Sequence, residues 1–130
     1  MNGSGITRLS PKGHAVQGLS EWTDMPLVGD VVGNMVPQER YYRAFNTVIN
    51  SPTEVRAGVW QATAYAEKVT DYPYNEIVFV VEGTLTIIDE VGQEEHFSPG
   101  ESFFLERGFN GEWRQYETVK IFHMTVDPKA

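Results

Sequence analysis

Cysteine is absent from this chain. Disulfide bonds, thiolate zinc sites and a cysteine nucleophile are therefore excluded, and the absence fits a reducing compartment. Long apolar runs are absent too, since no stretch approaches the roughly 18–20 residues that a membrane helix needs. The opening residues Met1-Asn-Gly-Ser-Gly lack the apolar core of a secretory signal. We therefore expect a cytoplasmic protein that has no membrane partner.

Positive charge is scarce, with 10 Lys and Arg residues against 18 Asp and Glu residues and a net charge of −8. Such a chain has no basic surface with which to bind nucleic acid or anionic lipid, so neither is expected as a partner. Common catalytic motifs are also missing: there is no phosphate-binding glycine loop after a strand, no Gly-x-Ser-x-Gly and no His-Glu-x-x-His. The histidines, His14, His96 and His123, are too scattered to indicate a serine triad.

What the chain does have is a repeated alternation of short apolar segments and turns. Its 130 residues suit one domain with a real core. We interpret residues 1–40 as an N-terminal arm and packing segment, because glycine, serine and proline interrupt any regular period there. No helical period follows Arg40. Residues 41–130 predict an all-β sandwich or barrel, with strands expected at 41–49, 54–62, 66–70, 76–81, 84–88, 94–97, 102–105, 111–116 and 119–126.

One of these strands carries a charge into an apolar run. Residues 76–83 read Glu-Ile-Val-Phe-Val-Val-Glu-Gly and stop at a glycine turn. Since alternate strand residues share a face, Glu76 points to the same side as Val78 and Val80. A carboxylate on a buried face is costly unless it is paired, protonated or bound to a metal, and burial raises its pKa toward the range useful for proton transfer. Glu76 is therefore a candidate catalytic acid or base, or one half of a structural ion pair.

Lys120 has a similar position on the last strand. It shares a face with Phe122 and Met124, and a lysine on a core-facing stripe needs a partner. Glu76 is the natural candidate, which predicts a salt bridge between the two inside one pocket. Lys120 would then be a second catalytic candidate that positions an anionic group or moves a proton; the alternatives are a structural pair, or an exposed lysine on a strand of the opposite phase. His123 has the opposite parity, which predicts that it faces away from the pocket.

Six short motifs follow one another along the chain. They are Gly58-Val-Trp60, Glu76-x6-Gly83, Asp89-x2-Gly92, Pro99-Gly100-Glu101, Gly108-x2-Gly111-x-Trp113 and Val119-Lys120. In this order they resemble the cupin superfamily, over roughly residues 57–125, and most of all the small single-domain group related to ureidoglycine aminohydrolase and to an ethanolamine-utilisation cupin. The resemblance implies a cupin double-stranded β-helix, which is a jelly-roll barrel, and often a dimer.

The resemblance also implies where a cupin metal would be held, and this chain departs from that pattern. The two histidine positions of the first motif fall on Thr70 and Tyr72, and the histidine position of the second motif falls on Gly111. Only Glu76 remains, whereas a divalent transition metal usually needs three or four nitrogen or oxygen ligands. We therefore expect no metal and no other cofactor. A metal-dependent enzyme with atypical ligands, His96 or His123 beside Glu76, is the alternative.

Aromatic side chains complete the predicted site. Trp113 shares a face with Gly111, and the resemblance implies that it forms a pocket wall of the kind that small-ligand sites have. Tyr72 and Tyr74 stand where metal ligands would, and a tyrosine hydroxyl can donate to a substrate oxygen. The plainer interpretation of Trp113 is an ordinary core aromatic. Trp60 we assign to the core.

These residues together predict a small-molecule-binding cupin. In the first hypothesis it is a metal-independent hydrolase, isomerase or lyase that acts on a small polar metabolite, with Glu76 as acid or base. In the second it is a non-catalytic ligand-binding or accessory protein with the same pocket. The face opposite Glu76 carries Ile77, Phe79 and Val81, an apolar strip that predicts a homodimer unless residues 21–38 cover it.

Overall fold

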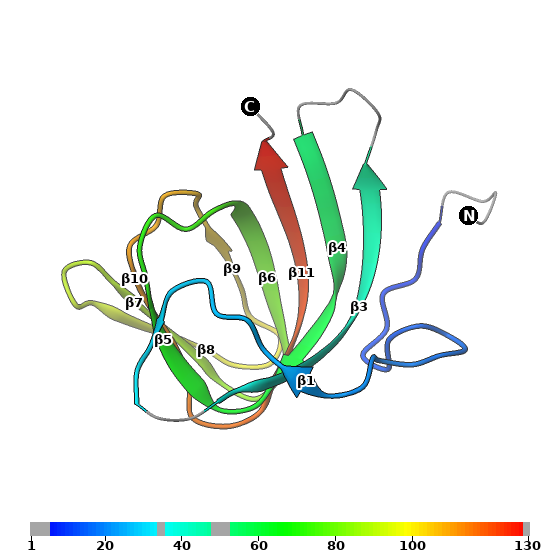
Figure 1. Ribbon diagram of the computed structural model, residues 1–130, viewed down its shortest axis with the longest axis horizontal. Coiled ribbons are helices and arrows are strands. Elements are labelled where there is room, and N and C mark those ends of the chain that lie inside the picture. The colour runs from blue at the N-terminus through cyan, green and yellow to red at the C-terminus, as the bar shows by residue number, and fades with distance from the viewer. Residues whose placement is uncertain (1–5, 34–35, 48–52, 129–130) are drawn as a thin grey trace.

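Two antiparallel β-sheets make up the regular structure of the computed structural model, which describes residues 6–33, 36–47 and 53–128 (Figure 1). The six-stranded sheet has the order β1-β3-β4-β11-β6-β9, and the five-stranded sheet has the order β2-β5-β10-β7-β8. Within these residues there is no helix long and apolar enough to span a membrane. The strands are β1 Thr23–Asp24, β2 Asp30–Val31, β3 Gln38–Thr47, β4 Thr53–Ala62, β5 Tyr65–Val69, β6 Asn75–Glu82, β7 Leu85–Asp89, β8 Glu94–Phe97, β9 Ser102–Leu105, β10 Gly111–Gln115 and β11 Val119–Pro128.

The all-β prediction is confirmed, and each strand expected after residue 40 is present with its ends shifted by a few residues at most. The end predicted at residues 48–49 lies outside the described residues. The turns form where the sequence places glycine. Gly83, between β6 and β7, has a φ of 79°, a backbone conformation that glycine adopts without the steric cost of a side chain. Gly92 has a φ of 89° in the turn between β7 and β8. The Gly83 turn takes the chain from the six-stranded sheet to the five-stranded sheet, and the Gly92 turn closes a hairpin within the five-stranded sheet.

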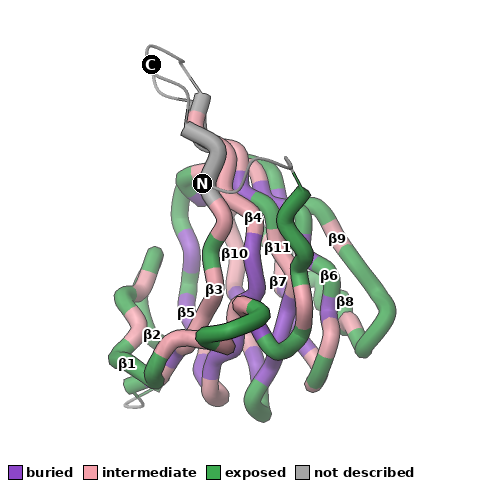
Figure 2. Tube along the Cα trace, turned by 90° about the vertical axis from the view of Figure 1, so that its right-hand side faces the viewer, coloured by how far each residue is buried: buried purple, intermediate pink, exposed green. Residues whose placement is uncertain are grey.

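The core lies between the two sheets (Figure 2). Alternation along β6 decides which side chains enter it: Val78 and Val80 are fully buried, whereas Ile77 is 46% exposed and Phe79 is 41% exposed. Burial of the inner stripes supplies the main favourable free energy of folding, since apolar area removed from water stabilises by about 25 cal/mol per Å². The core cluster comprises Ala62, Tyr65, Val69, Tyr72, Val78, Val80, Leu85, Ile87, Leu105, Trp113, Val119 and Ile121.

The N-terminal segment is tied to both sheets. β1 pairs with β3, and β2 pairs with β5. Earlier residues pack on the outer face of β3, where the His14 ring contacts the Tyr42 ring at 5.4 Å in an edge-on arrangement and the Tyr41 amide donates to Ser20. Between β1 and β2, residues 25–28 contribute to the wall of a pocket. The segment therefore covers one part of the molecule's outside and also closes over one end of its interior.

Another part of the outer surface is apolar and is left exposed by the residues that the structure describes. Ile77 on β6 lies beside Phe104 on β9 and Met124 on β11, and all three are exposed. Phe79 stacks on Phe122 with ring centroids 6.1 Å apart. Residues 21–33 pair with β3 and β5 instead of β6, so they do not cover this strip.

Candidate functional site

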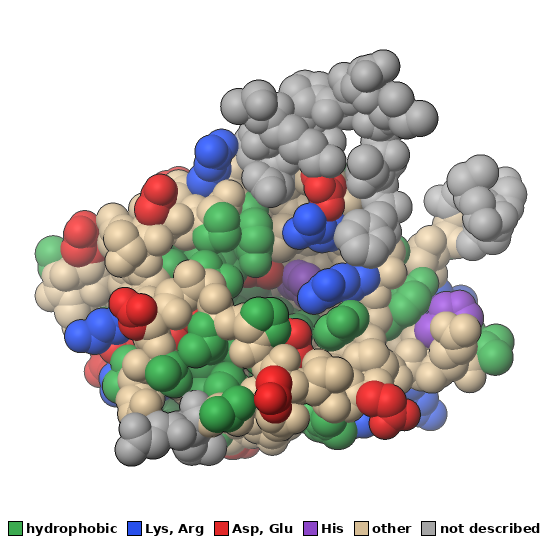
Figure 3. Space-filling model, viewed as in Figure 1, with side chains coloured by type: hydrophobic (Ala, Val, Ile, Leu, Met, Phe, Trp, Pro, Cys, Tyr) green, Lys and Arg blue, Asp and Glu red, His purple; other side chains and the backbone are tan. Residues whose placement is uncertain are grey.

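A pocket of about 320 Å³ opens between the two sheets. Figure 3 shows a hollow on this face of the molecule, with acidic side chains and a histidine inside it and Lys or Arg side chains on one rim. The volume is at the small end of the range for ligand sites, which suits a small metabolite. The lining residues are Met25, Pro26, Leu27, Val28, Glu39, Arg43, Trp60, Tyr65, Glu67, Tyr72, Tyr74, Glu76, Trp113, Ile121 and His123.

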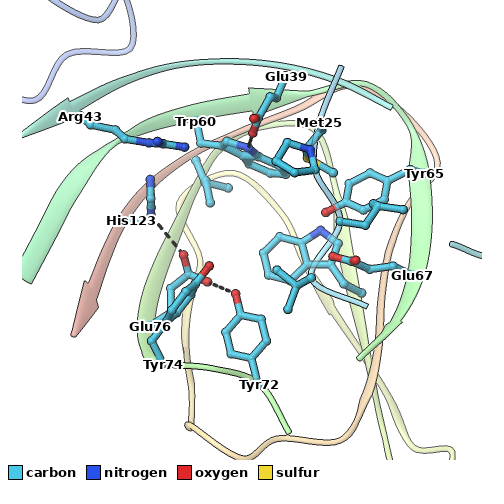
Figure 4. Close-up of a pocket in the computed structure, with 15 residues that line it drawn as sticks. Met25, Glu39, Arg43, Trp60, Tyr65, Glu67, Tyr72, Tyr74, Glu76 and His123 are labelled. Carbon is cyan, nitrogen blue, oxygen red and sulfur yellow. Dashed lines mark hydrogen bonds and ion pairs between the residues drawn. The ribbon is translucent and has the colours of Figure 1, made fainter. Parts of the chain in front are cut away.

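Glu76 lies at one end of this pocket and is held by two side chains (Figure 4). The Tyr72 hydroxyl donates to Glu76 Oε1 at 2.6 Å, and His123 Nδ1 lies 3.1 Å from Glu76 Oε2. Burial raises the pKa of Tyr72 well above its usual value, and the Glu76 charge raises it further. Tyr72 therefore stays protonated at neutral pH and acts as a donor to the carboxylate.

The prediction that His123 faces away from the pocket is wrong. Strand parity correctly grouped Lys120 with Phe122 and Met124, but this stripe lies on the outer face, where Phe122 stacks on Phe79. The inner stripe of β11 is the alternate one, with Ile121 and His123. Strand parity identifies the residues that share a face but not which face points inward. Because β11 carries apolar residues on both faces, its sequence could not identify the inner face.

The predicted pairing of Glu76 with Lys120 is wrong for the same reason. Lys120 does not line the pocket; its Nζ donates to the Pro11 carbonyl at 2.8 Å and lies 3.7 Å from Glu82 Oε2. In the β11–β6 ladder Lys120 is opposite Glu82, and Glu76 is opposite Thr125. Five residues of β11 separate the two positions, which is about 16 Å of strand. Lys120 therefore holds the N-terminal arm against the barrel.

The aromatic residues predicted for the site do gather there. Tyr72 and Tyr74 contact each other edge-on with ring centroids 5.1 Å apart, and Trp113 lines the same pocket. Trp60, which we assigned to the core, packs against the core and also lines the pocket. Its ring meets Trp113 at 6.0 Å and Tyr65 at 6.5 Å, both nearly perpendicular.

Two buried carboxylates in the pocket were missed in the sequence. Glu39 on β3 accepts a hydrogen bond from Trp60 Nε1 at 2.9 Å, and Glu67 on β5 accepts one from the Gly29 amide at 3.0 Å. Glu67 sits on a stripe with Tyr65 and Val69, which is the same signal that singled out Glu76. Burial raises the pKa of Glu67, although the Gly29 and Val28 amides oppose the shift.

The family's metal positions do not form a metal site here. Thr70 is exposed, Tyr72 is committed to Glu76, and a side chain at Gly111 would place its Cβ 2.1 Å from the Ile88 carbonyl oxygen. His96 lies on β8 beside Thr86, away from Glu76 and His123. The described residues contain no group of three or more His, Cys, Asp or Glu side chains that could hold a metal ion. The residues present do not fit a cupin metal.

Two antiparallel sheets with a polar pocket between them are an architecture that cupins share with other β proteins. More particularly, the chain belongs to the EutQ-like cupin family, whose domain model matches residues 51–122. The predicted relation to the ethanolamine-utilisation cupin is thereby confirmed, while the relation to ureidoglycine aminohydrolase stays a prediction. A search of curated proteins found no match.

Solved structures share this fold. A protein of unknown function in the DUF861 family from Pseudomonas syringae is 23% identical with a TM-score of 0.77, over 95% of this chain and 48% of that one. This chain thus spans about half the length of that relative. The EutQ protein of Clostridium difficile is 24% identical with a TM-score of 0.54 over 70% of both chains. Ectoine synthase from P. lautus is 16% identical with a TM-score of 0.55, over 82% of this chain and 70% of that one. Identities this low show the fold alone.

Proposed function

We propose that this protein binds a small polar metabolite in the pocket and that Glu76 and His123 move a proton on it. The observation that carries the proposal is a buried carboxylate in hydrogen-bond contact with an imidazole inside a cavity of about 320 Å³. An acidic and a basic side chain in contact inside a cleft are candidates for general acid–base catalysis. Hydrolase, isomerase and lyase chemistry all need this proton transfer.

The arrangement gives each side chain a distinct task. Glu76 and His123 share a contact at 3.1 Å, so a proton taken from the ligand by one can be held by the other. Tyr72 donates to the second oxygen of Glu76 and fixes its orientation. Because Tyr72 keeps its proton at neutral pH, it is a positioning residue for the carboxylate and not the base.

The test has two stages. A metabolite screen by thermal shift identifies ligands, and each hit is then assayed for turnover. If the wild-type protein converts one of these ligands to product, Glu76→Gln should lower kcat for it by about 100-fold or more, which is the usual effect of losing a general acid or base. The variant should still bind the ligand. Glu94→Gln, the same change on exposed strand β8, is the matched control. Wild-type turnover in Glu76→Gln would overturn the catalytic role.

Binding without turnover by the wild-type protein would favour the alternative function, a non-catalytic ligand-binding or accessory cupin. The hydrogen bonds to Glu76 suit that function as well, because they would hold the carboxylate ready to contact a ligand. Measuring turnover of the same hits therefore separates the two.

A further inference from the structure

We propose that the ligand of this pocket carries a positively charged ammonium group, bound between Glu39 and Glu67 and against the rings of Trp60, Tyr65 and Trp113. This inference rests on the proposed function, since it names the class of small molecule that the same site takes. Figure 4 places Glu39, Glu67 and Tyr65 away from the Glu76–His123 pair, across the cavity. The ammonium end would thus lie opposite the groups that move the proton.

The first argument is an excess of buried negative charge. Glu39, Glu67 and Glu76 are 6%, 5% and 6% exposed, and all three line the cavity. Arg43 also lines it, but its guanidinium lies 4.0 Å from the Tyr41 ring centroid. No lysine or arginine among the described residues forms a salt bridge with any of the three. Buried carboxylates without a cation are costly, so a cationic ligand would compensate them.

A second argument is that the three carboxylates share one cavity with Tyr65, which lines it beside them. Burial raises the pKa of Tyr65 well above its usual value, and the charges of Glu67, Glu76 and Glu39 raise it further. Burial also raises the pKa of Glu67, and an ammonium group beside it would favour its ionised form.

The third argument is the kind of surface that the rings present. The indole donors are already used, by Glu39 for Trp60 and by Gln115 for Trp113. What remains for a ligand is ring surface from Trp60, Trp113 and Tyr65, and the Trp113 and Tyr65 rings each lie nearly perpendicular to the Trp60 ring. Aromatic faces attract cations through their quadrupole, and several faces around one site are typical of ammonium recognition.

The carboxylates also set the hydrogen-bonding character of the cavity. An ionised carboxylate only accepts hydrogen bonds, and Glu39, Glu67 and Glu76 all line the cavity. A ligand rich in N–H donors or positive charge satisfies these oxygens, and an anionic ligand does not.

The experiment compares cations with neutral molecules of the same shape on the wild-type protein. Choline is paired with dimethylbutanol, its carbon isostere, and ethanolamine with ethylene glycol, each titrated by calorimetry at low salt. We expect at least one cation to bind about tenfold or more tightly than its neutral partner, since one cation–π contact or ion pair in a desolvated site contributes that much. Glu67→Gln and Glu39→Gln should each remove most of this preference, and Glu94→Gln should leave it unchanged.

Equal or weaker binding of both cations relative to their neutral partners, up to millimolar concentration, would overturn the inference without any variant. Its failure is distinguishable from failure of the proposed function. If a neutral or anionic metabolite is turned over with dependence on Glu76, the proposed function stands and the ammonium inference falls. If cations bind preferentially but no hit is turned over, the ammonium inference stands and the catalytic role falls.

Discussion

His123 on β11 and Glu76 on β6 meet diagonally across the strand pair inside the pocket, with Nδ1 3.1 Å from Oε2. In the ladder His123 is opposite Val78 and Glu76 is opposite Thr125. Diagonal neighbours on one face of a sheet are within reach of long side chains. The predicted lysine–carboxylate pair is thus an imidazole–carboxylate pair, and the imidazole has one nitrogen that can donate and one that can accept a hydrogen bond.

The hydrogen bond from Tyr72 to Glu76 is expected to stabilise the fold. Tyr72→Phe removes only the hydroxyl and leaves a buried carboxylate oxygen without its donor. Hydrogen bonds to charged groups contribute about 1.5–3 kcal/mol, so the free energy of unfolding in urea should fall by about that amount. Tyr116→Phe, at an exposed tyrosine, should change it by less than about 0.5 kcal/mol. Equal effects of the two variants would contradict the importance of this contact.

Glu67 should make stability depend on pH in a defined direction. Burial raises the folded-state pKa of Glu67 above the ordinary value of about 4.3. The contribution of Glu67 to the free energy of unfolding is therefore fully present in acid and is lost as the pH rises through the folded-state pKa. Glu67→Gln does not titrate and keeps a carbonyl oxygen for the Gly29 amide. The variant should therefore melt higher than wild type at pH 8, with the difference shrinking toward pH 4. If the difference in melting temperature between the variant and the wild type grew toward acid pH instead, the predicted direction of the pH dependence would be wrong.

Lys120 should matter for stability and not for ligand chemistry. Lys120→Met keeps the packing of the stem but loses the hydrogen bond to Pro11 and the contact with Glu82. We expect a loss of about 1 kcal/mol in unfolding free energy, easier proteolysis of the N-terminal arm, and unchanged ligand binding. Lys68→Met on the exposed face of β5 is the control. Lost turnover at unchanged stability would restore Lys120 as a catalytic candidate.

The purified protein should carry no stoichiometric transition metal. The ligand positions of the family fall on an exposed Thr70, on Tyr72 bonded to Glu76, and on Gly111, where a side chain would meet the Ile88 carbonyl. Elemental analysis of protein purified without chelators measures this directly. About one equivalent of manganese, iron, zinc or nickel that depends on Glu76 and His123 would contradict the prediction.

The exposed strip around Ile77 should mediate a homodimer. Ile77 is 46% exposed and Phe104 is 55% exposed on adjoining strands, and apolar surface of this kind is typical of an association site. Light scattering at micromolar concentration should give twice the 14.7 kDa chain mass. Phe104→Lys should shift the protein to a monomer, and Val91→Lys, at an exposed valine in the β7–β8 turn, should not. A monomeric wild-type protein would rule out the dimer.

The sequence by itself determined the strands, their turns and the family. These are local properties: an alternating apolar pattern, a glycine at a turn, a motif at fixed spacing. It also identified Glu76, because a carboxylate among valines is unusual wherever the strand lies. The same local signal was available for Glu67 on the stripe of Tyr65 and Val69.

Only the tertiary structure decided which face of β11 turns inward and therefore whether Lys120 or His123 meets Glu76. Both faces of that strand carry apolar side chains. One face packs in the core, and the other lies partly beside the N-terminal arm that Lys120 holds and partly in the exposed strip around Ile77. A hydrophobic pattern cannot tell which of two apolar faces points inward. The gathering of Glu39 and Glu67 into the same cavity depends likewise on sheet packing between residues far apart in the chain.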